Sequence, residues 1–62
     1  MTTDAQYIAL GYKYEMAKTV GAAQAAAKAI RALIEAERIE DRASARYFVD
    51  RGRQEARMEV AA

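Results

Sequence analysis

The sequence has no histidine, cysteine, tryptophan or proline among its 62 residues. Without cysteine there can be no disulfide, and without cysteine and histidine the common zinc sites are excluded. The side chains that most often act as catalytic base and nucleophile are missing for the same reason. Ser44 is the only serine, and the three isolated glycines form no phosphate-binding loop. We therefore expect a protein that is not an enzyme and that holds no cofactor or metal.

Large apolar side chains and net charge are scarce too. Hydrophobic residues make up 53% of the chain, but 16 residues are alanine and only ten are Leu, Ile, Val or Phe. That composition approaches the composition of disordered chains, whereas a net charge of +1 and the absence of proline are untypical of disorder. A chain of this length also buries only a modest share of its surface. We expect one helical domain, residues 1–62, that is reinforced by a partner protein or by assembly into a homo-oligomer.

No part of the sequence has the pattern of a membrane span or a signal peptide. The longest apolar region, residues 20–34, is mostly alanine and is interrupted by Gln24, Lys28 and Arg31, so it is too weakly hydrophobic to cross a bilayer. The first four residues are polar and acidic rather than basic and then apolar. These features predict a cytoplasmic protein that does not bind membranes.

The residues that are abundant predict an all-α fold. Ala, Glu, Lys, Arg, Gln and Met dominate the chain, and these are the strongest helix formers. Thr3 and Gln6 match a capping box, which predicts a helix that begins at Asp4. From there an apolar seam with alternating spacings of four and three runs without a phase shift, which favours one long helix over residues 4–39. The seam residues are Ala5, Ala9, Tyr12, Met16, Thr19, Ala23, Ala26, Ile30 and Leu33.

A second helix is predicted over residues 42–59, because the first seam fails at Glu37 and a new seam begins after it. Asp41 or Ser44 would be its N-cap. The new seam consists of Ala45, Val49, Gly52 and Ala56, with Phe48 beside it. The two helices together give a helical hairpin. The competing interpretation ends a helix at Val20 and breaks the chain at Gly21, because glycine often follows a helix C-terminus, and it gives a small three-helix bundle.

Three tyrosines lie close together near the N-terminus and indicate a second apolar face. Tyr7 and Tyr14 are seven residues apart, and Leu10 lies between them on the same side of the predicted helix. A helix that is apolar on two faces must bury both, and tyrosine is enriched at the energetic centres of protein interfaces. We predict that Tyr7, Leu10 and Tyr14 anchor a partner protein. Packing within the chain is the alternative for the tyrosines.

Arginine is confined to the second half of the chain, where Arg42, Arg46, Arg53 and Arg57 share one face of the second predicted helix. We call these four residues the arginine row. Arginine pairs well with phosphate and carboxylate groups, so the row fits either a nucleic-acid backbone or a protein surface. Seven acids balance the seven arginines of residues 31–62, whereas nucleic-acid modules usually have a basic excess. The sequence therefore favours a protein partner over nucleic acid, and a solvated, salt-bridged surface is the plainest alternative.

These features favour a non-enzymatic helical module that binds another protein and acts by occupying that protein's surface, as a regulator or an inhibitor. Proteins of this size include phage and mobile-element inhibitors of host defence, a comparison that rests on size alone. The first alternative is a self-assembling subunit that forms a dimeric four-helix bundle. The second alternative is an accessory protein that binds the nucleic-acid backbone through the arginine row.

Overall fold

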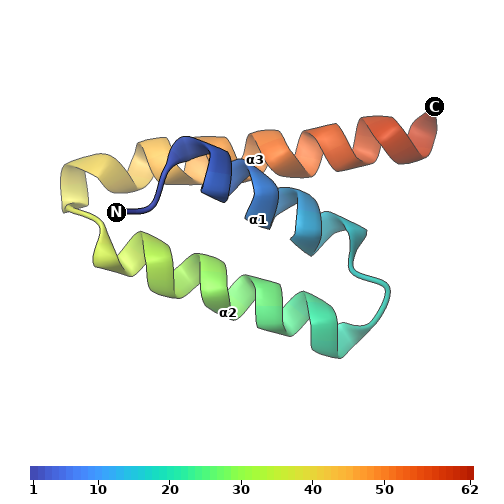
Figure 1. Cartoon of the computed structure of the whole chain (residues 1–62), viewed down its shortest axis with the longest axis horizontal. Helices are drawn as coiled ribbons and strands as arrows, with labels where there is room; N and C mark the ends of the chain where they lie inside the picture. Colours follow the sequence, from blue (N-terminus) through green and yellow to red (C-terminus); the bar gives the residue numbers. More distant parts are fainter.

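The computed structural model describes all 62 residues and is built from helices alone. Helix α1 spans Asp4–Met16, α2 spans Val20–Ala36 and α3 spans Ile39–Ala61 (Figure 1). The all-α class predicted from composition is confirmed. None of the three helices combines the length and the apolar character that a membrane crossing requires.

The start of α1 is set by a local hydrogen-bond motif, as the sequence predicts. The Thr3 hydroxyl oxygen accepts a bond from the Gln6 backbone N–H at 3.2 Å, and the Gln6 side-chain oxygen accepts one from the Thr3 backbone N–H at 2.7 Å. Asp4 adds a negative charge in the first turn, where the helix dipole favours it. The capping box and the helix start at Asp4 are both confirmed.

The single helix predicted over residues 4–39 is wrong, because the chain leaves the helical conformation after Met16. Ala17 is extended, and Thr19 caps α2 by accepting a hydrogen bond from the Ala22 backbone N–H at 3.1 Å. The three-helix alternative is therefore the correct one, but the break precedes Gly21, which lies exposed within the first turn of α2. A capping hydroxyl, rather than a glycine, makes this break.

The second break also differs from the predicted one. Helix α3 begins at Ile39, three residues earlier than expected, and neither Asp41 nor Ser44 caps it. Asp41 instead lies in the first turn, where its charge suits the helix dipole. Glu37 and Arg38 are extended and form the whole connection to α2, and the Arg38 side chain makes no capping bond.

Helices α1 and α3 pack most closely, at a crossing where each presents a glycine to the other's backbone. A Cβ atom on Gly11 would lie 2.8 Å from the carbonyl carbon of Val49. One on Gly52 would lie 2.8 Å from the carbonyl carbon of Ile8 and 2.9 Å from the Tyr12 nitrogen. Only glycine permits so short a separation of the two backbones. The predicted seam of α3 is confirmed, because its four members are the buried residues of that helix: Ala45, Val49, Gly52 and Ala56.

The seam predicted for the first half lies on the inner side of α2 but only partly on the inner side of α1, where Tyr12 and Met16 are half-buried. In α2 it includes Ala26, which is buried, whereas Ala5 and Ala9 of α1 are exposed and the buried residues there are Tyr7 and Gly11. Once the chain breaks, α1 is free to rotate relative to the phase of α2. Only 8 of the 62 residues are buried in total.

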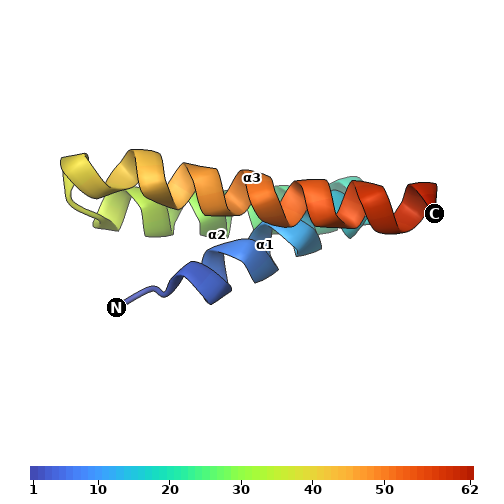
Figure 2. The ribbon, with the colours of Figure 1, turned by 90° about the horizontal axis from the view of Figure 1, so that it is seen from above.

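The three helices do not close around their core. Figure 2 shows α2 and α3 at the same height, α1 rising to them from one side, and no helix on the other side. Helix α2 has much less contact with α3 than α1 has. One side of the layer formed by α2 and α3 is therefore open to solvent.

Candidate functional site

A small hollow lies between α2 and α3, beside Tyr14 of α1, and we call it the α2/α3 groove. Its lining residues come from all three helices: Tyr14, Ala27, Ile30, Val49 and Arg53. The hollow measures about 170 Å³, which is below the range of ordinary small-molecule pockets, about 300 to 1,000 Å³. It is large enough to receive a side chain of another molecule, but too small for a typical ligand or cofactor.

Tyr7 does not lie in this groove, and its predicted role as a partner anchor is wrong. Its side chain is 2% exposed and belongs to the core with Ile34, Ala45 and Val49. Its hydroxyl lies 3.2 Å from the Leu33 carbonyl oxygen and 3.1 Å from a carboxylate oxygen of Glu37, and it donates its single proton to this pair. Burial, followed by the hydrogen bond and the charge of Glu37, raises the pKa of the Tyr7 hydroxyl. The alternative of packing within the chain holds for this tyrosine.

Tyr14 and Leu10 are half-buried and remain partly accessible. The Tyr14 ring lines the groove, and the Arg53 guanidinium carbon lies 5.1 Å from the ring centre. A cation over a tyrosine face is held by the ring's quadrupole. Leu10 lies one turn before Tyr14, on the same side of α1. Of the three predicted anchors, Tyr14 is thus the one that the structure brings to the groove.

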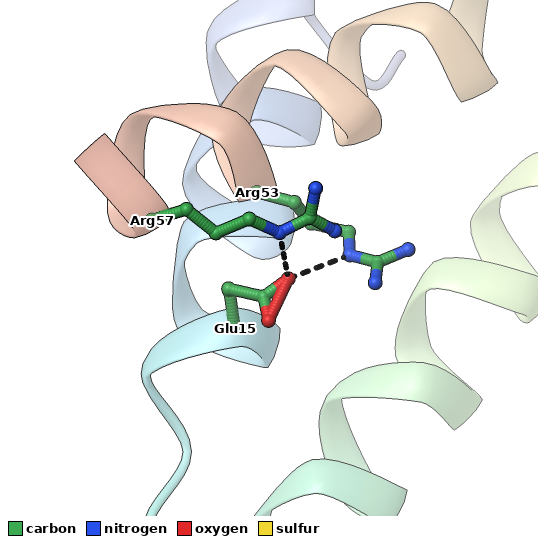
Figure 3. Close-up of polar contacts among 3 residues, drawn as sticks. All are labelled: Glu15, Arg53 and Arg57. Carbon is green, nitrogen blue, oxygen red and sulfur yellow. Dashed lines mark hydrogen bonds and ion pairs between the residues drawn. The ribbon is translucent and has the colours of Figure 1, made fainter. Parts of the chain in front are cut away.

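Two members of the arginine row converge on one carboxylate of α1. The Nε atoms of Arg53 and Arg57 each lie 3.1 Å from the same oxygen of Glu15 (Figure 3). The hydrogen bond from Arg53, supported by the bond and charge of Arg57, holds the pKa of Glu15 below its usual range. Two guanidinium groups share a single negative charge, so this cluster keeps a net positive charge.

The other two members of the row differ from each other. The Arg42 guanidinium donates to the backbone oxygens of Glu35 and Glu37, at 3.0 and 3.3 Å, and so satisfies carbonyl groups at the end of α2. Arg46 is exposed and forms no ion pair with any residue of the chain. Because Arg42 reaches α2, its side of α3 is the side that faces α2. The spacing of the row places the other three arginines along the same side.

The groove residues on α2 were not recognised from the sequence. Ala27 and Ile30 belong to the apolar pattern of residues 20–34. An apolar pattern of this kind does not distinguish a face that is buried in the core from a face that is accessible to another molecule. Both residues are half-buried, and Ile30 also packs against the core. Their partial exposure follows from the break at Ala17–Thr19, which lets α1 cover only one side of α2. The sequence signal that could have indicated the break was the threonine at position 19.

A second and larger hollow, of about 440 Å³, lies beside the N-terminus. Three acids line it, Asp4, Glu37 and Asp41, but the chain has no group of three or more ligating side chains arranged to hold a metal ion. The hydroxyl of Tyr7, which also lines it, is already hydrogen-bonded. No buried side-chain polar atom in the protein lacks a partner. This hollow therefore offers no specific chemistry for a ligand.

Comparison with known proteins adds no family to this description. No protein-family model, no curated protein and no solved structure matches the chain. The chemistry of the α2/α3 groove is thus the basis for the function proposed below.

Proposed function

We propose that the protein is a non-enzymatic module that binds a helix of another protein in the α2/α3 groove. By occupying that surface of its partner, it would act as a regulator or an inhibitor. The observation that best supports the proposal is the open, partly apolar groove in a chain that buries only 8 of its 62 residues. Two neighbouring helices with an uncovered apolar strip between them are the usual receptor for an amphipathic helix.

The dimensions of the groove suit a helix better than a small molecule. Two of its walls are the helices α2 and α3, the Tyr14 ring of α1 completes the lining, and the hollow admits a single side chain. Ala27 is small and lets another helix approach closely, while Ile30 and the Tyr14 ring provide larger apolar contacts. A docked helix would cover this half-buried apolar surface. Each Å² of apolar surface removed from water would contribute roughly 25 cal/mol of favourable free energy.

Self-assembly through the same groove is less favoured. A twofold contact between two copies pairs each surface patch with its own counterpart. That geometry would bring one arginine row against the other, and like charges in such a contact are strongly unfavourable. A nucleic-acid partner would satisfy the arginine row but would leave the apolar floor of the groove without a matching surface.

The proposal is tested with a display library of helix-forming peptides as long as α2, 17 residues. Peptides selected on the unaltered protein should bind Ala27→Gln at least about tenfold more weakly, because the longer side chain fills the hollow. The matched control is Ala32→Gln, the same substitution at an exposed position on another side of α2, and it should bind as the unaltered protein does. If no peptide is selected, or if both variants bind equally well, the groove is not a helix receptor.

A further inference from the structure

We propose that the helix that fills the α2/α3 groove is acidic. Its apolar stripe would enter the groove, and Asp or Glu residues would flank that stripe. This inference rests on the proposed function and specifies the chemistry of the partner. The placement of charged groups around the groove supports it.

Positive charge lies on both walls of the groove. On α2, Arg31 follows Ala27 by four residues and therefore shares its side of the helix. On α3, Arg46 precedes Val49 by three residues and Arg53 follows it by four. A helix lying between α2 and α3 would thus have guanidinium groups along each of its flanks.

Most of these arginines have no acidic partner within the chain. The structure contains three ion pairs, and none of them involves Arg31, Arg42 or Arg46. Arg53 and Arg57 share Glu15 through their Nε atoms, and the hydrogen bonds of the structure leave their terminal nitrogens free. The exposed carboxylate of Asp50 is the one acid of α3 near this side, and it cannot balance the row.

Three of the nine acids of the chain lie on another edge of α3. Asp41 and Glu55 are each seven residues from Phe48 and share its side of the helix. Glu59 is close to the same phase, and its carboxylate accepts a 2.6 Å hydrogen bond from the Tyr12 hydroxyl. The net charge of +1 therefore conceals two edges of opposite sign, and the groove lies along the basic edge.

Arg53 indicates where a partner carboxylate would bind. Its guanidinium lies over the Tyr14 ring at the edge of the hollow, with one side held by Glu15. A planar guanidinium fixed in this way is suited to a second carboxylate through its terminal nitrogens. The partner should therefore carry an acid three or four residues from the apolar side chain that enters the hollow, because these positions are neighbours on a helix.

The experiment compares selections from one peptide library that is random at the positions flanking a fixed apolar stripe. On the unaltered protein, selected peptides should be enriched in Asp and Glu, and acidic peptides should bind at least about tenfold more tightly than their Gln counterparts. On the double variant Arg31→Glu, Arg46→Glu, the enrichment should change to Lys and Arg. Arg51→Glu, an exposed arginine on another side of α3 that forms no ion pair, is the matched control and should keep the acidic preference.

Each other outcome overturns the inference in a distinguishable way. The selected peptides could show no charge preference, or the double variant could keep the preference for acidic peptides. Either result would mean that the groove binds helices but that its arginines do not determine which helix binds. A dimer in solution that Ala27→Gln dissociates would make a second copy the occupant. Oligonucleotides that bind more tightly than every selected peptide would make the partner a nucleic acid, and a selection that yields no peptide would remove the proposed function itself.

Discussion

At the crossing of α1 and α3, each backbone lies against a glycine of the other helix, with Gly11 facing Val49 and Gly52 facing Ile8. Glycine is a poor helix former, and its presence inside both helices costs about 1 kcal/mol each relative to alanine. The short separation that results brings many backbone and Cβ atoms into dispersion contact. No larger residue fits at either position. Close packing of the two helices therefore decides the residue type here, although glycine lowers helix propensity.

Gly52→Ala should therefore destabilise the protein although alanine favours a helix. Its Cβ would lie under 3 Å from backbone atoms of Ile8 and Tyr12, so the two helices must separate, and overpacking of this kind costs about 1–3 kcal/mol. Gly21→Ala is the control, since nothing lies within 4 Å of a Cβ at that position, and it should stabilise by up to about 1 kcal/mol. Urea unfolding followed by circular dichroism measures both, and a gain of stability in Gly52→Ala would contradict the close crossing.

The ends of the helices depend on side chains that compete with the apolar pattern. At Thr3 the cap and the pattern agree, and the start of α1 could be predicted to the residue. At Thr19 they disagree, because the seam continues in phase through a residue that caps a new helix. Which of the two prevails depends on tertiary packing: a break lets α1 pack on α3 at the glycine crossing, and this gain is not visible in the spacing of one segment.

The candidate site could be predicted only in part for the same reason. The arginine row follows from spacing within one helix, and α3 is long enough to contain all four residues. The groove depends instead on which side of α2 the helix α1 leaves uncovered. Tyr7 and Tyr14 have the same residue type and the same helical phase, yet one is 2% exposed and the other lines the groove. Their depth in the bundle decides this difference, and sequence does not encode depth directly.

The cap at Thr19 can be tested apart from packing, because the residue is exposed and its side chain makes a single capping bond. Thr19→Ala removes that bond and should lower the free energy of unfolding by about 1 kcal/mol, which corresponds to roughly 4–8 °C in the melting temperature of a domain of this size. Thr19→Ser keeps the hydroxyl and should melt as the unaltered protein does. Equal melting of all three proteins would show that the break does not depend on this cap.

Over the whole molecule, charge is separated more than composition suggests. One edge of α3 carries the arginine row, and the acids Asp41, Glu55 and Glu59 lie on another. Glu15 is the only carboxylate that forms an ion pair with the row, and it does so from α1. This contact joins α1 to α3, and it also reduces the repulsion between Arg53 and Arg57. The stability of the bundle is therefore linked to the ionisation of Glu15.

This link predicts a specific dependence of stability on pH. The folded state holds the pKa of Glu15 below its usual range, chiefly through the hydrogen bond from Arg53, so folding is favoured when the carboxylate is charged. The stabilisation should be fully present above the pKa of an unfolded glutamate, about 4.3, and should be lost as the pH falls through the lower pKa of the folded protein. Glu15→Gln should remove the part of the acid-induced loss of stability that comes from Glu15, and it should be less stable than the unaltered protein at neutral pH.

Glu55→Gln is the control, because it changes an exposed carboxylate that forms no ion pair. Thermal melts across the acid range should show the unaltered pH dependence for that variant. If Glu15→Gln keeps the full acid-induced loss of stability, the ionisation of Glu15 does not hold α1 against the arginine row.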